Sequence, residues 1–148
     1  MKPDKPTDTR RDFPHFAQLQ TRWADNDVYG HVNNATYYSY FDTLVNQMLI
    51  ERNLLDPAKS ASIGVVVETG CHFFASLSFP DVIDAGLRVS SIGNSSVRYE
   101  IALFRHGENE PAATGHFVHV YVDRATRRPV PVPAEVRAGL EPLIRAVT

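Results

Sequence analysis

Apolar side chains recur every three or four positions between residues 34 and 52, which is the spacing of one face of an α-helix. The apolar positions of this series are Tyr37, Tyr40, Phe41, Leu44, Val45, Met48 and Leu49. Asn33 or Asn34 can cap the beginning, because an amide oxygen accepts a hydrogen bond from an unpaired backbone N–H. The pattern therefore predicts one helix over 34–52, about 28 Å long at 1.5 Å per residue.

Most of the remaining chain shows the short alternating or β-branched runs that are typical of strands. We predict strands over 16–24, 62–69, 71–79, 86–92, 96–105 and 113–122, and a terminal amphipathic helix over 134–146. In the last predicted strand, Phe117, His119 and Tyr121 face one way and the valines between them face the other. Without β-α-β alternation, these elements predict an α+β fold in which an antiparallel sheet wraps around one long central helix. Pairing of its free edge across a two-fold axis would give a dimer.

Length and composition narrow the possible classes of protein. The 148 residues suit a single domain, which we expect over 16–148 behind an N-terminal tail over 1–15. The formal net charge of −2 disfavours a nucleic-acid partner, and the single cysteine excludes an intrachain disulfide. The longest aliphatic run, 65–67, is too short to cross a bilayer. We therefore expect a cytoplasmic protein with no membrane partner.

The stretch that is richest in chemistry immediately precedes the predicted central helix. It carries two carboxylates, Asp25 and Asp27, followed by Gly30, His31 and a pair of asparagines. A helix N-terminus presents unpaired N–H groups and partial positive charge, which can stabilise a developing oxyanion. A carboxylate on the preceding loop can act beside it as a base or nucleophile. The arrangement suits attack on a polarised carbonyl.

Other kinds of site fit the residues poorly. A calcium loop opened by Asp25 would have Tyr29 at its fifth position and Thr36 at its twelfth. His116 and His119 lie three apart on a predicted strand, so they face opposite sides and do not suit one metal ion. There is no Gly-x-Ser-x-Gly elbow, phosphate loop or dinucleotide-binding glycine motif. We therefore expect no metal and no cofactor.

Three segments carry a resemblance to a known family. The run Arg22-Trp23-x-Asp25-x-Asp27-x-x-Gly30-His31-Val32-Asn33-Asn34-x-x-Tyr37-x-x-Tyr40-Phe41-Asp42 resembles the signature of hotdog-fold acyl-CoA thioesterases, in particular the 4-hydroxybenzoyl-CoA thioesterase-like family. The segments 89–97 and 119–131 resemble that family's hairpin and its closing strand and loop. The likeness covers about residues 16–133.

The resemblance implies an acyl-CoA thioesterase that forms a homodimer or homotetramer with its active site at a subunit interface. It makes Asp27 the catalytic carboxylate and the backbone N–H of Asn34 the donor to the thioester carbonyl. Some relatives carry Tyr or His where this chain has Asn34, and Phe79-Pro80-Asp81 replaces the more usual Pro-x-x-x-Gly-Asp. We expect Asp25 to be structural, paired with Arg22, and keep Glu68 as a reserve carboxylate.

Substrate binding is assigned to residues near the predicted site and to groups that could hold the phosphates of CoA. These residues are Gly30, His31, Arg88, Ser95, Ser96, Arg98, Arg124 and Arg128, and Arg127 is a further arginine that could hold a phosphate. Two other functions remain open at this stage. A hotdog hydratase or dehydratase would use His31 and Asp27 for proton transfer, and a non-catalytic acyl-thioester-binding protein would keep the pocket without using Asp27.

Overall fold

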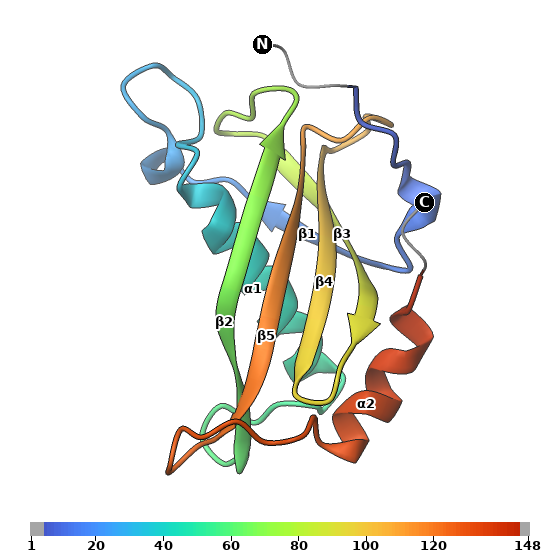
Figure 1. The fold of residues 1–148 in the computed structure, drawn as a ribbon. Helices are drawn as coiled ribbons and strands as arrows, with labels where there is room; N and C mark the ends of the chain where they lie inside the picture. The colour runs from blue at the N-terminus through green and yellow to red at the C-terminus, as the bar shows by residue number, and fades with distance from the viewer. Residues whose placement is uncertain (1–4, 146–148) are drawn as a thin grey trace.

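A computed structural model describes residues 5–145 of the chain and contains one antiparallel sheet with two helices (Figure 1). The strands are β1 (His15–Gln20), β2 (Ser62–Phe73), β3 (Val82–Ile92), β4 (Ser96–Arg105) and β5 (Ala113–Asp123), and the helices are α1 (Thr36–Glu51) and α2 (Ala134–Leu140). The strand order across the sheet is β1-β3-β4-β5-β2. The predicted α+β class with an antiparallel sheet is confirmed, and β1 and β2 are the edge strands.

Helix α1 has 16 residues and packs its predicted apolar stripe against the sheet. Phe41, Leu44, Val45 and Met48 are fully buried, because the helix crosses the strands with this face inward. Gly115 on β5 allows a close approach, since a Cβ there would lie 2.4 Å from the Phe41 ring. The helix is shorter than predicted because Asn33 and Asn34 stay in the preceding turn, where the Asn33 side chain accepts a hydrogen bond from the Ala35 N–H.

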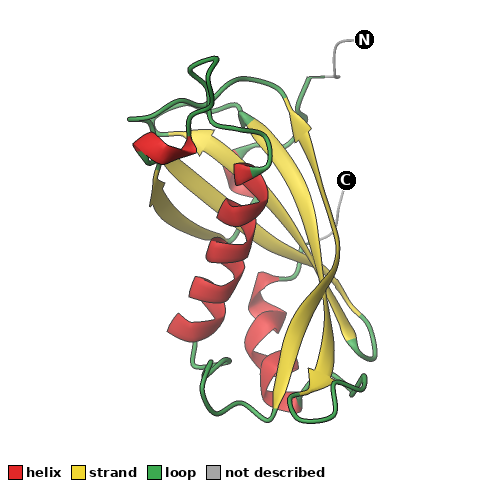
Figure 2. Cartoon of the chain, turned by 90° about the vertical axis from the view of Figure 1, so that its left-hand side faces the viewer, coloured by secondary structure: helices red, strands yellow, loops and turns green. Residues whose placement is uncertain are grey.

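Helix α2 lies on the same face of the sheet as α1, so two helices cover that face (Figure 2). Its side chains Val136 and Leu140 are buried in the same core. The predicted terminal helix over 134–146 is shorter in the structure and continues as a 3-10 turn over Glu141–Leu143. Residue 146 lies outside the described residues.

Two predicted strands are one in the structure. The segments 62–69 and 71–79 form the single strand β2, which ends at Phe73, and 74–81 is a loop. A bulge between Val66 and Glu68 shifts the register against β5 and breaks the alternation. The predicted strand 16–24 ends at Gln20 and is followed by a 3-10 turn, and the predicted strand 86–92 begins earlier, at Val82.

Part of the predicted N-terminal tail lies against the outer face of the sheet, away from the helices. Phe13 is buried in a small cluster with Ala102 and Phe104. The Arg10 guanidinium sits 4.7 Å from the centre of the Phe104 ring and pairs with Asp84 at 3.0 Å. These contacts join residues between 74 and 94 positions apart, so local patterning does not predict them. Residues 1–4 of the predicted tail lie outside the described residues.

Candidate active site

An open cavity of about 350 Å³ lies at the N-terminal end of α1, beneath the loop that connects β1 to the helix. Its walls come from three segments: the loop, the first turn of α1, and the chain that follows β2. The lining residues are Asp27, His31, Val32, Asn34, Tyr37 and the segment 73–76. The structure therefore brings together three of the predicted site residues, Asp27, His31 and Asn34.

Asp27 is held in a tight turn with its carboxylate partly exposed. Its backbone N–H donates to the His31 carbonyl at 2.8 Å, and its Oδ1 accepts from the Tyr29 N–H at 2.9 Å. Gly30 has φ of 82°, a left-handed conformation that glycine adopts without strain, so the turn can close. The carboxylate keeps lone pairs free toward the cavity, because only one of its oxygens receives that hydrogen bond.

The backbone N–H groups at the beginning of α1 are not equivalent. The Asn33 N–H donates to the Asp25 carbonyl at 2.9 Å, and the Ala35 N–H donates to the Asn33 side chain at 2.9 Å. Between them, the Asn34 N–H has no hydrogen-bond acceptor within residues 5–145. A free N–H at a helix N-terminus, on the wall of the cavity that Asp27 also lines, is suited to bind a carbonyl oxygen.

Asp25 differs from Asp27 in its surroundings, although the two lie only two positions apart. Its side chain is buried, and Oδ2 accepts hydrogen bonds from the Arg22 N–H and the Tyr40 hydroxyl, each at 2.8 Å. Arg22 also pairs with Oδ1 at 3.0 Å. Burial acts to raise the pKa of Asp25, but these hydrogen bonds outweigh it and leave the pKa below its ordinary value. Asp25 thus ties the loop to α1.

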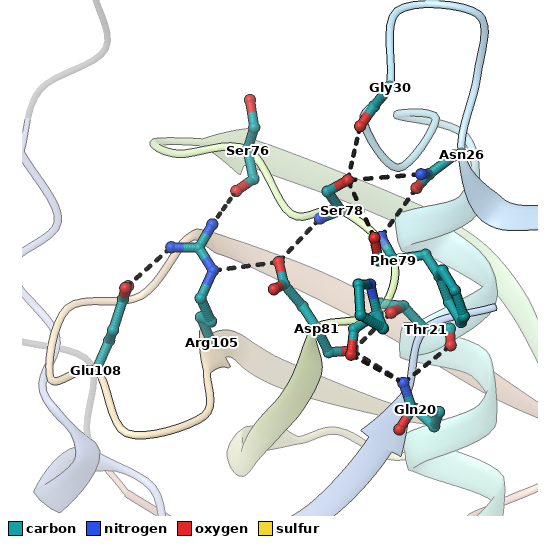
Figure 3. Close-up of polar contacts among 11 residues, drawn as sticks. Gln20, Thr21, Asn26, Gly30, Ser76, Ser78, Phe79, Asp81, Arg105 and Glu108 are labelled. Atoms are coloured by element: carbon teal, nitrogen blue, oxygen red, sulfur yellow. Dashed lines mark hydrogen bonds and ion pairs between the residues drawn. The ribbon is translucent and has the colours of Figure 1, made fainter. Parts of the chain in front are cut away.

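The loop that carries Asp27 is also fastened to segment 76–81 (Figure 3). The Ser78 hydroxyl donates to the Gly30 carbonyl at 2.7 Å, and the Asn26 side chain accepts from the Phe79 N–H at 3.0 Å. Asp81 in turn accepts from the Ser78 N–H at 2.9 Å and pairs with Arg105 at 3.1 Å. This network holds the loop that carries Asp27 against segment 76–81.

Sequence reasoning missed segment 73–76 and the network behind it, because it assigned those residues to a strand. The Phe79-Pro80-Asp81 step, at the end of the predicted strand 71–79, is the feature of the sequence that indicates a loop here. Tyr37, predicted as a core residue, is buried and also lines the cavity, packing edge-to-face on Phe73 at 4.9 Å. Cys71 is not suited to act as a nucleophile, since burial raises the pKa of its thiol to about 12.

The other predicted substrate-binding residues lie away from this cavity. Ser95 and Ser96 sit at the β3–β4 hairpin, and Arg124 and Arg128 sit in the loop after β5. Both segments are at the opposite end of the sheet from Asp27, at the bottom of Figure 1. Arg128 is exposed, whereas the Arg124 guanidinium donates to the carbonyls of Ser60 at 2.6 Å and Pro57 at 2.8 Å.

Arg88 and Arg98 lie on the outer face of the sheet. Arg88 is buried, pairs with Asp8 at 3.1 Å and stacks on the Phe13 ring at 4.7 Å, so a phosphate would have to displace Asp8. Arg98 pairs with Glu100 and with Glu68, the reserve carboxylate. Glu68 also contacts His116 at 3.0 Å on this outer face and does not line the cavity with Asp27.

No cluster of three or more His, Cys, Asp or Glu that could hold a metal ion occurs within residues 5–145. Across the same span, no helix is long and apolar enough to cross a membrane. The polar groups among the residues that line the cavity include the Asp27 carboxylate, the unpaired Asn34 N–H and the His31 ring.

The fold and this site define a class of protein. The sequence model of the thioesterase-like superfamily matches residues 21–140, and the chain belongs to that superfamily. The five-stranded antiparallel sheet with its helix matches the hotdog fold of such proteins. This confirms the predicted thioesterase resemblance at the level of the superfamily.

Individual relatives agree with this assignment. The crystal structure of the PA5185 protein from Pseudomonas aeruginosa strain PAO1 is 50% identical, with a TM-score of 0.93, over 97% of this chain and 100% of that chain. A Thermus thermophilus thioesterase, solved with coenzyme A and Zn, is 28% identical with a TM-score of 0.74, over 89% and 95%. Acyl-acyl carrier protein thioesterase ATL3 of Arabidopsis thaliana is 25% identical over 133 residues, 88% of this chain and 70% of that protein.

Proposed function

We propose that this protein hydrolyses acyl-CoA thioesters, with Asp27 acting on the thioester carbonyl. The observation that carries the proposal is that the Asp27 carboxylate and the unpaired Asn34 N–H line one cavity at the beginning of α1. Hydrolysis needs a group that delivers an oxygen nucleophile and a donor that stabilises the resulting oxyanion. Membership of the thioesterase-like superfamily supports the reaction, and the CoA-bound relative supports the substrate class.

The reaction can follow either of two balanced routes. As a general base, Asp27 takes a proton from water while the water oxygen bonds to the carbonyl carbon. As a nucleophile, an Asp27 oxygen bonds to that carbon, and water later cleaves the mixed anhydride. In both routes the Asn34 N–H and the helix dipole stabilise the oxyanion, the C–S bond breaks, and CoA leaves as a thiolate that takes up a proton. A single oxyanion donor of this kind contributes roughly 2.7–4 kcal/mol in other enzymes.

The working unit in this proposal is at least a homodimer built on the edge strand β2. Val66 and Val67, near the middle of β2, are 44% and 58% exposed, which is unusual for adjacent valines on a free strand edge. Two copies of β2 paired antiparallel would cover them. In this pairing the β2 strand of the second copy runs in the opposite direction. The end of the sheet that carries Arg127 and Arg128 in one protomer would then lie beside the end that carries Asp27 in the other. The assembly would thus join the carbonyl site to candidate phosphate-binding groups.

The test is release of free CoA thiol from a panel of acyl-CoA substrates by the wild type and by Asp27→Asn. Asn is nearly isosteric, so its side-chain oxygen can still accept from the Tyr29 N–H. It lacks the basic oxygen, so kcat should fall by roughly 10²–10⁴ with substrate binding retained. Asp42→Asn, on the exposed face of α1, is the matched control and should keep full activity.

Full activity in Asp27→Asn would refute the mechanism, and a loss confined to Glu68→Gln would move the active carboxylate to β2. Binding of acyl-CoA without thiol release would favour the non-catalytic alternative. A product that keeps its thioester and gains or loses water would favour the hydratase alternative. Thiol release only from acyl carrier protein thioesters would show that the substrate is carried by acyl carrier protein instead of CoA, with the same hydrolytic mechanism.

A further inference from the structure

A second cavity, of about 200 Å³, lies toward the C-terminal end of α1, away from Asp27. Leu49 of α1, Leu54 and Leu55 of the following loop, and Ile63 at the beginning of β2 form its apolar wall. His119 and Tyr121 of β5 supply polar groups. The mechanism proposed above does not use this cavity.

His119 is the unusual residue of this wall. Only 2% of it is exposed, and its Nδ1 has no hydrogen-bond partner among the described residues. Burial lowers the pKa of His119 to about 4, so the ring is neutral at pH 7. The His119 ring makes T-shaped contacts with the rings of Tyr99 and Phe117, whose centres lie 5.8 and 5.1 Å from its own. A buried imidazole nitrogen without a partner is costly unless something binds to it.

The backbone of β2 leaves room beside that nitrogen. A Cβ at Gly64 would lie 2.6 Å from His119 Nδ1, so any larger residue at position 64 would push the ring aside. Gly64 and His119 both line the cavity, and the ring lies at its β2 wall with Nδ1 packed over Gly64. The cavity that the His119 ring lines is much larger than one water molecule, whose share of liquid volume is about 30 Å³.

We propose that this cavity binds the far end of the substrate's acyl group, and that His119 hydrogen-bonds to a hydroxyl or oxo group there. The inference rests on the proposed thioesterase function. Because a 150 Å³ apolar cavity in another protein holds benzene, about 200 Å³ suits one six-membered ring or a chain of similar bulk. Acyl groups of this size with a polar group remote from the thioester would be preferred.

The proposed dimer supplies the route to this cavity. Within one protomer, Asn34 and Asn46 are twelve residues apart on the α1 segment, or about 18 Å at 1.5 Å per residue. Antiparallel pairing centred on the middle of β2 would instead place Ser62–Gly64 beside the partner's strand end at Cys71–Phe73. The His119 cavity of one protomer would then adjoin the Asp27 cavity of the other.

Matched substrates test the proposal: hexanoyl-CoA with 6-hydroxyhexanoyl-CoA, octanoyl-CoA with 8-hydroxyoctanoyl-CoA, and acetyl-CoA, which is too short to reach the cavity. We expect the wild type to favour one hydroxylated member at least tenfold in kcat/KM, as a site built to bond a hydroxyl discriminates against its absence. His119→Leu should bring that ratio to within about twofold while acetyl-CoA hydrolysis is unchanged. His116→Leu, on the outer face of the same strand, is the matched control and should keep the preference.

Two further measurements keep the test decisive. If His119→Leu does not fold, Leu55→Phe fills the cavity without altering the histidine and should abolish hydrolysis of the longer substrates only. Independently, 6-hydroxyhexanoate should shift the ¹⁵N resonances of the His119 ring in the wild type more than hexanoate does. Such a shift without any thioester hydrolysis would support the cavity and refute the proposed function. Acetyl-CoA hydrolysis with no hydroxyl preference and no shift would overturn the cavity assignment alone.

Discussion

Replacing Asp25 by Asn should weaken the fold rather than the chemistry. The carboxylate accepts two hydrogen bonds at Oδ2, from the Arg22 N–H and the Tyr40 hydroxyl, in a buried position. The Asn oxygen can occupy the Oδ2 position and keep both bonds, but the acceptor is then neutral. The new amide group faces the Arg22 guanidinium, which is 74% exposed and can turn into solvent at little cost.

The expected loss of folding free energy in Asp25→Asn follows from replacing two hydrogen bonds to a charged acceptor by two to a neutral one. Hydrogen bonds to charged groups contribute about 1.5–3 kcal/mol and neutral ones about 0.5–1.5 kcal/mol, so two bonds lose about 2 kcal/mol together. For a domain of this size, that corresponds to a decrease in Tm of roughly 4–8 °C. Asp25→Ala should cost more, since it leaves the Tyr40 hydroxyl and the Arg22 N–H buried without an acceptor. Asp42→Asn on the helix surface should stay within about 0.5 kcal/mol of the wild type.

Urea unfolding at fixed protein concentration measures these differences, because association would otherwise contribute to the apparent stability. The pKa of Asp25 is lower in the folded protein than its ordinary value of 3.8. Its contribution is therefore fully present above that pH and is lost as the pH falls through the folded pKa. The stability difference between wild type and Asp25→Asn should be constant near neutral pH and should shrink below pH 3.8.

Thiol release assays on the same samples complete the test. Asp25→Asn should retain most of kcat at a temperature where it is fully folded. A variant that unfolds like the wild type but no longer releases thiol would refute the reasoning, because Asp25 would then be the carboxylate engaged in the chemistry.

Two further predictions concern the substrate and the loop that carries Asp27. Replacing Arg127 and Arg128 together by Ala should raise KM for acyl-CoA more than it lowers kcat, because contacts to the nucleotide are remote from the carbonyl; an unchanged KM in steady-state kinetics would place the nucleotide elsewhere. Ser78→Ala removes the hydroxyl that donates to the Gly30 carbonyl at 2.7 Å. We expect kcat to fall several-fold with little change in KM. Unaltered kinetics would show that this contact does not position the loop.

The sequence was most informative where the structural signal is local. Regular periodicity predicts the apolar face of α1, which is buried, and the shared face of Phe117, His119 and Tyr121 on β5, which the structure shows to be the buried face of that strand. The two predicted strands 62–69 and 71–79 are separated only by Gly70, whereas in the structure the pairing with β5 continues through Gly70 and makes them one strand. The N-terminal packing of Phe13 depends on partners about ninety residues away, which periodicity does not encode.

The candidate site also has a part that follows from local sequence and a part that depends on long-range contacts. Asp27 and Asn34 are seven positions apart in the loop before α1, so their proximity at the N-terminus of α1 is a consequence of local sequence. The sequence predicts phosphate binding by Arg88, but in the structure its guanidinium pairs with Asp8 and stacks on Phe13, both of which are distant in the sequence. The segment 73–76 joins the cavity because Asp81 and Arg105 hold the following loop in place, a contact between residues 24 positions apart.

The separation of the carbonyl site from Arg127 and Arg128 leads to a test of the assembly itself. Strand β2 has 12 residues, and at about 3.3 Å per residue it spans roughly 40 Å, so one protomer keeps these groups at opposite ends. If the antiparallel dimer unites them, each site takes Asp27 from one subunit and the arginines from the other.

Mixing Asp27→Asn with the Arg127→Ala, Arg128→Ala variant under conditions that allow subunit exchange should then restore thiol release. At substrate concentrations well below the raised KM, both parents are nearly inactive. Random pairing of equal amounts makes half of the dimers mixed, and each mixed dimer has one intact site of two, so about a quarter of wild-type activity should return. Light scattering should show a mass of at least two chains in every sample. Dimers that form but regain no activity would refute a site shared between subunits, and a monomer with wild-type activity would refute the assembly.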